Sequence, residues 1–132
     1  GNNEALFKVK DKAEMIIARG DKNININGEN FLISPYNNWW LIWTPWELWT
    51  YAEGDNLDLK TRSGENLQDV IPLDKHNTLA LVWKNKTTVL IPYYLVSHDL
   101  INEKIKQAAA DSENKILYYT LKNKDGLWTL NY

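Results

Sequence analysis

The chain has 132 residues, which is the size of one domain with a substantial hydrophobic core. Its formal net charge is −2, so no overall positive field is available for a phosphate backbone, and nucleic acid is excluded as a general partner. It contains no cysteine, which excludes disulfides, thiolate metal sites and cysteine nucleophiles.

The composition and the first residue predict a domain of an exported bacterial protein. Asparagine, lysine and isoleucine are abundant, as in proteins of AT-rich bacterial genomes. Residue 1 is glycine, which we interpret as a tag remnant ahead of a single domain that spans 1–132. We therefore expect an upstream signal peptide, lipoprotein leader or membrane anchor, and membrane contact only through such a segment. The expected location is the periplasm, the cell surface or the medium.

The first predicted element is a helix over residues 4–19. Apolar residues recur at helical spacing from Leu6 to Ile17, lysines lie on the other face, and Gly20 is placed to end the helix. Two strands, ALFKVK and AEMIIA, are the alternative that this pattern leaves open, because apolar and polar residues alternate in the first.

A hairpin is predicted next, over residues 24–33. Its arms are two short apolar segments, and Asn27-Gly28 between them tolerates the positive φ of a tight turn. Both arms are therefore expected to pair with each other in one antiparallel sheet.

Five of the seven tryptophans lie between Trp39 and Trp49. The segment from 39 to 44 predicts a strand that is apolar on both faces and hence central in a sheet. Thr44-Pro45-Trp46-Glu47 has the pattern of a capping box, with threonine at the N-cap and proline at the first helical position. A short helix is therefore predicted from about 44 to 53.

The rest of the chain predicts further strands and a third helix. Alternating or apolar runs predict strands over 57–62 and 67–71, and hairpins that pair 78–83 with 88–96 and 116–121 with 127–131. Ser97 is placed to cap a helix that runs to about Asp111 and buries the residues Ile101, Ile105, Ala108 and Ala109.

These elements predict an α+β fold. A single domain is expected, in which a mostly antiparallel sheet is built from hairpins and accompanied by about three helices: N-terminal, short central and C-terminal. The sequence shows no evident internal repeat.

No catalytic residue, metal or cofactor is predicted. Ser97-His98-Asp99 has the residue types of a catalytic triad, but triad side chains converge from separate elements, so we interpret them as the start of a helix. His76 lies in a polar connector, and two histidines without cysteine lack the spacing of a metal site. The oxygen spacing of a calcium loop is absent around Asp55 and Asp58.

The tryptophan-rich segment has three interpretations. In the first, the segment forms part of the hydrophobic core. In the second, part of it lines a groove for a carbohydrate or peptide. In the third, it is a contact patch for another protein. Lipid is a weaker partner because acids outnumber bases over residues 45–75. The residues that we expect to contribute to binding are Tyr36, Trp40, Trp46, Trp49 and Tyr51.

The leading functional hypothesis is a non-enzymatic binding domain that uses this aromatic surface for a protein or carbohydrate ligand. One alternative is a small enzyme acting on sugars or cell-wall glycans, with Glu53 or Asp55 as an acid. Glu47 also lies beside tryptophans, but it is already engaged in the predicted cap. Another alternative is the soluble head of a membrane-anchored assembly subunit, whose first helix continues upstream into the membrane.

Overall fold

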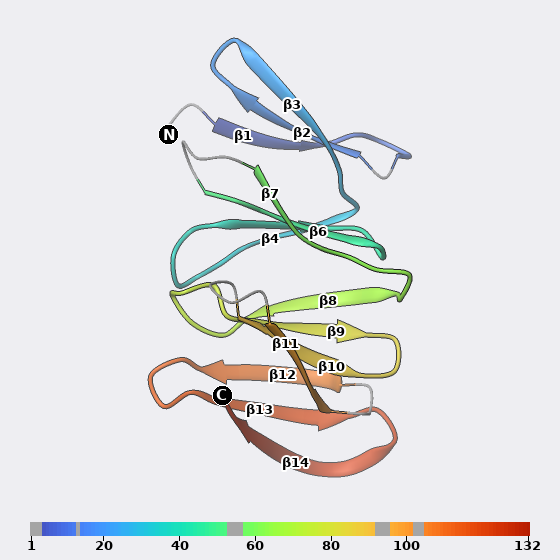
Figure 1. Cartoon of the computed structure of the whole chain (residues 1–132), viewed down its shortest axis with the longest axis vertical. Coiled ribbons are helices and arrows are strands. Elements are labelled where there is room, and N and C mark those ends of the chain that lie inside the picture. The colour runs from blue at the N-terminus through green and yellow to red at the C-terminus, as the bar shows by residue number, and fades with distance from the viewer. Residues whose placement is uncertain (1–3, 13, 53–56, 92–95, 102–104) are drawn as a thin grey trace. The chain divides into compact units, whose positions relative to one another are not determined.

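The computed structural model describes residues 4–12, 14–52, 57–91, 96–101 and 105–132. In these ranges the chain forms 14 strands and no helix. The strands make four sheets, and all the pairings between neighbouring strands are antiparallel (Figure 1). The predicted α+β class with three helices is therefore wrong, and the described chain is all-β.

Each sheet is a meander, in which strands that follow one another in the chain lie side by side. The first sheet holds β1 (Glu4–Lys8), β2 (Glu14–Arg19) and β3 (Lys22–Asn27). The second holds β4 (Asn30–Ile33), β5 (Trp40–Trp43), β6 (Glu47–Tyr51) and β7 (Leu57–Arg62). The third holds β8 (Leu67–Pro72), β9 (Leu79–Trp83), β10 (Thr87–Ile91) and β11 (Val96–Ile101). The fourth holds β12 (Ile105–Asp111), β13 (Ile116–Leu121) and β14 (Lys124–Asn131).

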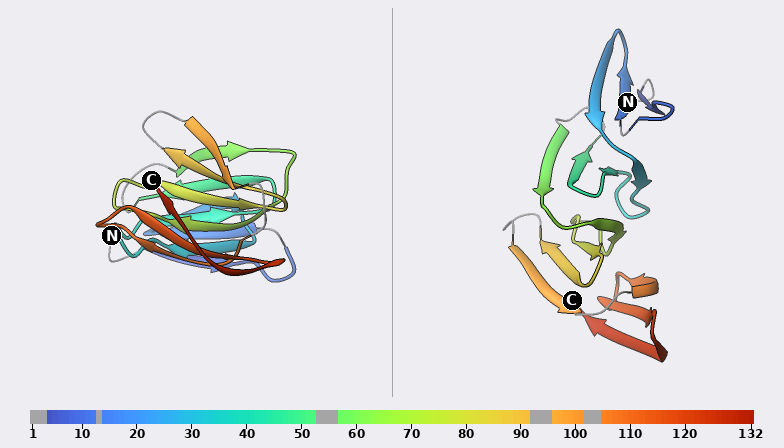
Figure 2. Two further views of the ribbon diagram at one scale, coloured as in Figure 1. Left: turned by 90° about the horizontal axis from the view of Figure 1, so that it is seen from below. Right: turned by 90° about the vertical axis from the view of Figure 1, so that its right-hand side faces the viewer.

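The chain divides into two compact units, which we describe separately. Unit 1 comprises residues 1–34 and 38–64, and unit 2 comprises residues 35–37 and 65–132. Unit 1 contains the first two sheets and unit 2 the last two. Figure 2 shows the same strands from two further sides.

The sheets repeat along the chain. The first strands of the second, third and fourth sheets begin at Asn30, Leu67 and Ile105, so the repeat is 37 or 38 residues long. The loop after each of these strands contains one non-glycine residue with a positive φ, namely Asn38 at 60°, Asn77 at 64° and Lys115 at 53°. The repeat is hidden in the sequence because different residues supply the same strand pattern.

The predicted first helix is wrong, and the two-strand alternative is confirmed. β1 and β2 pair from Glu4↔Arg19 to Lys8↔Met15. In β2 the alternate residues Met15 and Ile17 are fully buried, as expected of a strand with one face in the core. The helical spacing arose because apolar residues from two separate strands were counted as one stripe.

The predicted hairpin over residues 24–33 is also wrong, because its two arms belong to different sheets. β3 pairs with β2, whereas β4 pairs with β5. A Cβ atom on Gly28 would lie 2.6 Å from Cγ2 of Ile42, so glycine is needed here for close packing between two sheets. Gly28 is not among the glycines with a positive φ.

The predicted central helix is replaced by β6, although its capping interaction forms. The Oγ1 atom of Thr44 accepts hydrogen bonds from the backbone N–H groups of Trp46 and Glu47, each at 3.1 Å. The chain then turns back, and β6 pairs with β5 from Trp43↔Leu48 to Trp40↔Tyr51. A threonine that binds the backbone two or three residues ahead stabilises a turn as readily as a helix start.

The predicted third helix is replaced by two strands. β11 pairs with β10 and β12 pairs with β13, while residues 102–104 lie outside the described residues. The predicted strands 57–62 and 67–71 are confirmed as β7 and β8, and the predicted pairings of the two hairpins are confirmed as β9/β10 and β13/β14. The predicted arm 88–96 is too long, because β10 ends at Ile91 and Val96 begins β11, while residues 92–95 lie outside the described residues. β5 is indeed an interior strand of its sheet.

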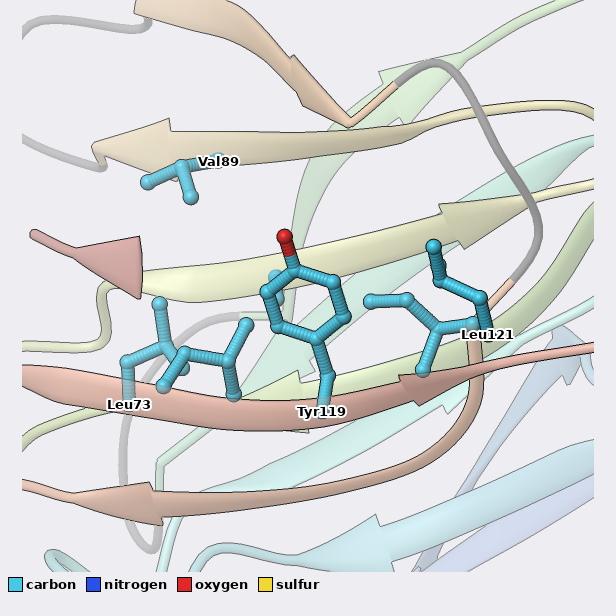
Figure 3. Close-up of a cluster of buried hydrophobic side chains, with 7 residues drawn as sticks. Leu73, Val89, Tyr119 and Leu121 are labelled. Carbon is cyan, nitrogen blue, oxygen red and sulfur yellow. The ribbon is translucent and has the colours of Figure 1, made fainter. Parts of the chain in front are cut away.

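Each unit has a core between the facing sides of its two sheets. In unit 1 the buried core residues are Met15, Ile17, Ile26, Ile42 and Tyr51. In unit 2 they are Leu73, Ala80, Val89, Ile105, Leu117, Tyr119 and Leu121. Figure 3 shows Tyr119 and Leu121 pointing from β13 toward the sheet that carries Val89.

Candidate functional site

The four aromatic residues of unit 1 that are expected to bind a ligand differ in their exposure. Tyr51 is fully buried, and its ring centroid lies 5.4 Å from that of Trp40, which packs against the core of unit 1. Trp49 is half-buried against the same core. Trp46 is 52% exposed in the turn between β5 and β6. Most of the tryptophan-rich segment is therefore core, and Trp46 is its exposed member.

Tyr36 belongs to unit 2, whereas the other four predicted binding residues belong to unit 1. Its hydroxyl donates a hydrogen bond to the carbonyl oxygen of Ala110 at 3.4 Å. Asn37, the next residue, donates from Nδ2 to the carbonyl oxygen of Lys75 and to Oδ1 of Asn77, each at 3.1 Å. These bonds join the loop at 35–37 to the β8–β9 loop and to the end of β12.

Glu47 is held as a carboxylate by its neighbours. Its oxygens accept hydrogen bonds from the indole Nε1 of Trp49 at 3.1 Å and from Asn27 at 3.5 Å, and Arg62 Nε lies 3.1 Å away. Burial acts to raise the pKa of Glu47, but these hydrogen bonds and the Arg62 charge outweigh it and lower the pKa. A general acid needs a raised pKa, so Glu47 is poorly suited to protonate a glycosidic oxygen. Glu53 and Asp55 lie outside the described residues.

A cavity of about 310 Å³ lies between the two sheets of unit 2. This is the size of a small-molecule site. It is lined by side chains from β10, from the loops that precede β9 and β13, and from the end of β14: Asp74, Thr78, Val89, Ile91, Lys115, Asn131 and Tyr132. Val89 and Ile91 supply an apolar wall, while Asp74 and Lys115 bring opposite charges to the same cavity.

Asp74 organises the loop that borders the cavity. Its side chain is buried, and Oδ1 accepts hydrogen bonds from the backbone N–H groups of His76 at 2.9 Å and Thr78 at 3.1 Å. A carboxylate that binds the backbone two residues ahead fixes a turn. Asn77, in the same turn, has a φ of 64°, which asparagine tolerates better than most residues.

Tyr132 closes one side of the cavity. Its hydroxyl donates a hydrogen bond to the carbonyl oxygen of Leu73, and the carbonyl oxygen of Asp111 lies 3.4 Å away. Burial, followed by the nearby Tyr36, Asp74 and Asp111, raises the pKa of Tyr132 from 10.0 to about 12. Tyr132 is therefore a neutral hydrogen-bond donor over the whole physiological range.

The raised pKa predicts alkaline sensitivity. The unfolded chain releases the tyrosine proton near pH 10.0 and the folded chain only near 12, so Tyr132 contributes stability that is complete below pH 10 and is lost as the pH rises through 12. The free energy of unfolding, measured with urea at a series of pH values, should fall between pH 10 and 12. It should fall less steeply for Tyr132→Phe than for the natural protein. Equal slopes for the two proteins would contradict this assignment.

A larger hollow of about 510 Å³ lies over β12, β13 and β14. It is a shallow depression whose lining includes Gln107, Ala109, Tyr118 and Leu127 and no charged side chain. Ligand sites combine enclosure with a few convergent polar groups. The smaller cavity beside Asp74 is therefore the better candidate.

The described ranges hold no group of three histidine, cysteine, aspartate or glutamate side chains placed to bind a metal ion. His76 is exposed, and Ser97-His98-Asp99 lies in β11 rather than at a helix start. Within the same ranges no helix is long and apolar enough to cross a membrane.

Sequence reasoning missed the cavity residues. Asp74, Lys115 and Tyr132 come from three loops or strand ends that only the repeated meander brings together. One signal was available: polar loops with asparagine recur at Asn38 and Asn77, each shortly before an apolar strand. No family model matches this chain, and no curated protein or solved structure matches it either.

Proposed function

We propose that the chain is a non-enzymatic binding domain that holds a short apolar peptide in the cavity of unit 2. The observation that carries this proposal is the pairing of an apolar wall, Val89 and Ile91, with opposite charges on Asp74 and Lys115. A peptide terminus or short zwitterionic peptide offers the matching groups: an ammonium for Asp74, a carboxylate for Lys115 and apolar side chains for the wall.

The surrounding loops support a preformed site. Asp74 and Tyr132 are each tied to backbone groups of other residues, so little ordering is needed when a ligand enters. Binding to a preordered site avoids much of the entropy cost of immobilising side chains. The proposal also places this binding domain outside the cytoplasm.

The test is a calorimetric titration of the protein with the dipeptide Leu-Leu, which measures the dissociation constant. Lys115→Gln should weaken binding by up to about fivefold, because an ion pair with an exposed lysine contributes at most about 1 kcal/mol. Lys122→Gln is the matched control, since Lys122 is exposed in the β13–β14 turn and does not line the cavity.

The chemistry of the ligand ends gives a second comparison. N-acetyl-Leu-Leu-amide has the same apolar side chains without the terminal charges, so it should bind more weakly than Leu-Leu. Equal binding of both peptides, or an equal effect of the two lysine substitutions, would contradict the proposed charge pairing.

A second candidate is contact with another protein through Trp46. Its 52% exposure in a turn is unusual for a tryptophan, and exposed tryptophans are frequent anchors of interfaces. This second candidate keeps the hypothesis that an aromatic side chain contacts a partner, but it assigns the contact to Trp46 alone instead of to five aromatic residues.

A further inference from the structure

The fourth sheet has an outer side that faces away from the core of unit 2. Successive residues of a strand point to opposite sides of its sheet. Tyr119 of β13 points toward the third sheet, as Figure 3 shows, so Tyr118 lies on the outer side. Gln107 and Ala109 of β12 share this side, because Ala108 between them packs against the core.

The residues on this outer side are more polar than those at the same positions of the third sheet. β8 and β12 begin at residues 67 and 105, so equivalent positions in the two sheets lie 38 residues apart. In the third sheet, Ala80 and Ile91 pack in the core that the fourth sheet covers. The same positions of the fourth sheet hold Tyr118 and Thr129. Their hydroxyl groups are typical of a surface that meets water or a polar ligand, and not of another core.

Tyr118 lies in the open hollow of about 510 Å³ over β12, β13 and β14. Ala109 is its partner in register, and this small side chain leaves room beside the tyrosine ring. Leu127 on β14 is 68% exposed and adds apolar surface to the hollow. None of the described residues that line the hollow is charged. The hollow therefore offers an aromatic ring and apolar surface without an electric charge.

Two neutral hydrogen-bonding side chains complete the lining. Gln107 and Thr120 are partners in the register of β12 and β13. The amide of Gln107 is exposed and can both donate and accept hydrogen bonds. The Oγ1 atom of Thr120 is shielded from water and has no hydrogen-bond partner among the described residues. An unsatisfied hydroxyl is unfavourable, so a ligand hydroxyl that turns Gln107 aside and reaches Thr120 gains a hydrogen bond.

We propose that this hollow binds a neutral oligosaccharide, which stacks one sugar ring on Tyr118 and forms hydrogen bonds with Gln107 and Thr120. A sugar ring combines apolar C–H groups with uncharged hydroxyl groups, and these match an aromatic ring beside neutral donors and acceptors. The open shape suits such a ligand, because its outward hydroxyl groups stay hydrated. A purely apolar small molecule needs a site that buries most of its surface. A charged ligand finds no opposite charge in the lining.

This site goes beyond the proposed peptide binding and does not depend on it. The hollow and the cavity beside Asp74 share no lining residue. Because the hollow is uncharged, saccharide binding should not change when salt is added, whereas binding of Leu-Leu between Asp74 and Lys115 should weaken. Lys115→Gln should leave saccharide binding unchanged.

The probe is cellotriose, a short neutral oligosaccharide, titrated into the 132-residue protein and followed by NMR of the backbone amides. We expect saturable shifts at residues 107–109 and 118–120. Tyr118→Ala should weaken binding at least about tenfold, because the stacked ring is lost. Tyr118→Phe keeps the ring and should bind within about threefold of the natural protein. Trp46→Ala, which removes an exposed aromatic ring of unit 1, is the control and should bind unchanged.

The polar contacts are tested by Gln107→Ala, which should weaken cellotriose binding by about threefold or more. Gln107 is exposed, so this variant should keep the thermal unfolding midpoint of the natural protein. It also keeps the proposal testable if Tyr118→Ala fails to fold, which its own unfolding midpoint reveals.

Four results would overturn the proposal. The first is an absence of saturable shifts in β12 and β13 at millimolar cellotriose. The second is undiminished binding by folded Tyr118→Ala or by Gln107→Ala. The third is an equal loss of binding in Trp46→Ala, and the fourth is a concentration-dependent dimer of this chain that covers Tyr118.

Discussion

Replacing Leu117 by alanine is expected to lower the free energy of unfolding by about 2–5 kcal/mol. Leu117 is fully buried on β13, in the core that joins the two sheets of unit 2. Removal of its isobutyl group loses the burial of apolar surface and leaves a cavity that the neighbouring side chains fill only in part.

The measurement is urea unfolding followed by tryptophan fluorescence. Leu127→Ala is the matched control, because Leu127 is 68% exposed on the adjacent strand β14 and should change stability by no more than about 0.5 kcal/mol. Similar losses for both variants would contradict the assigned core of unit 2.

The second large effect is expected at Gly28, where alanine should destabilise the protein by about 1–3 kcal/mol. The added Cβ would lie 2.6 Å from Cγ2 of Ile42 and 3.1 Å from Cγ and Sδ of Met15. Both neighbours are fully buried core residues, so relief requires movement of two packed side chains.

Gly64→Ala is the control, because a Cβ atom on Gly64 would meet nothing within 4 Å. Combining Gly28→Ala with Ile42→Ala tests the mechanism, since the smaller residue removes the closest contact. The cost of Gly28→Ala should then shrink. An undiminished cost in the Ile42→Ala background would show that contact with Ile42 is not the cause.

The sequence correctly predicted the strands that contain long apolar or alternating runs. β9 is apolar over its whole length and β10 over residues 89–91, and the short turn between Trp83 and Thr87 leaves no room for another element. The predictions failed where local signals are ambiguous. Thr44 forms its predicted hydrogen bonds, yet these stabilise a turn between strands as well as the first turn of a helix.

The hairpin signal of Asn27-Gly28 failed for a different reason. The glycine serves tight packing against Ile42 across two sheets, and no local pattern distinguishes this use from a turn with positive φ. Similarly, composition identified the tryptophan-rich segment as important, but it could not show that Tyr51 is buried and Trp46 exposed. That difference depends on which face of each strand meets a neighbouring sheet.

The cavity residues could not be predicted because the contact between them is created by the repeat. Asp74 and Lys115 are far apart in the sequence, and they meet because successive meanders place corresponding loops, β8–β9 and β12–β13, at the same end of the sheets in unit 2. Recognition of the 37- or 38-residue period would have aligned these loops.

In every sheet, hydrogen-bonded neighbours are strands that follow one another in the chain. Each strand finds its partner only a few residues away, so the entropy lost on closing the intervening chain is small. Among all-β proteins such a topology has a low contact order and favours rapid folding. During synthesis on the ribosome, each sheet can assemble as soon as its own strands emerge, before the following sheet has been translated.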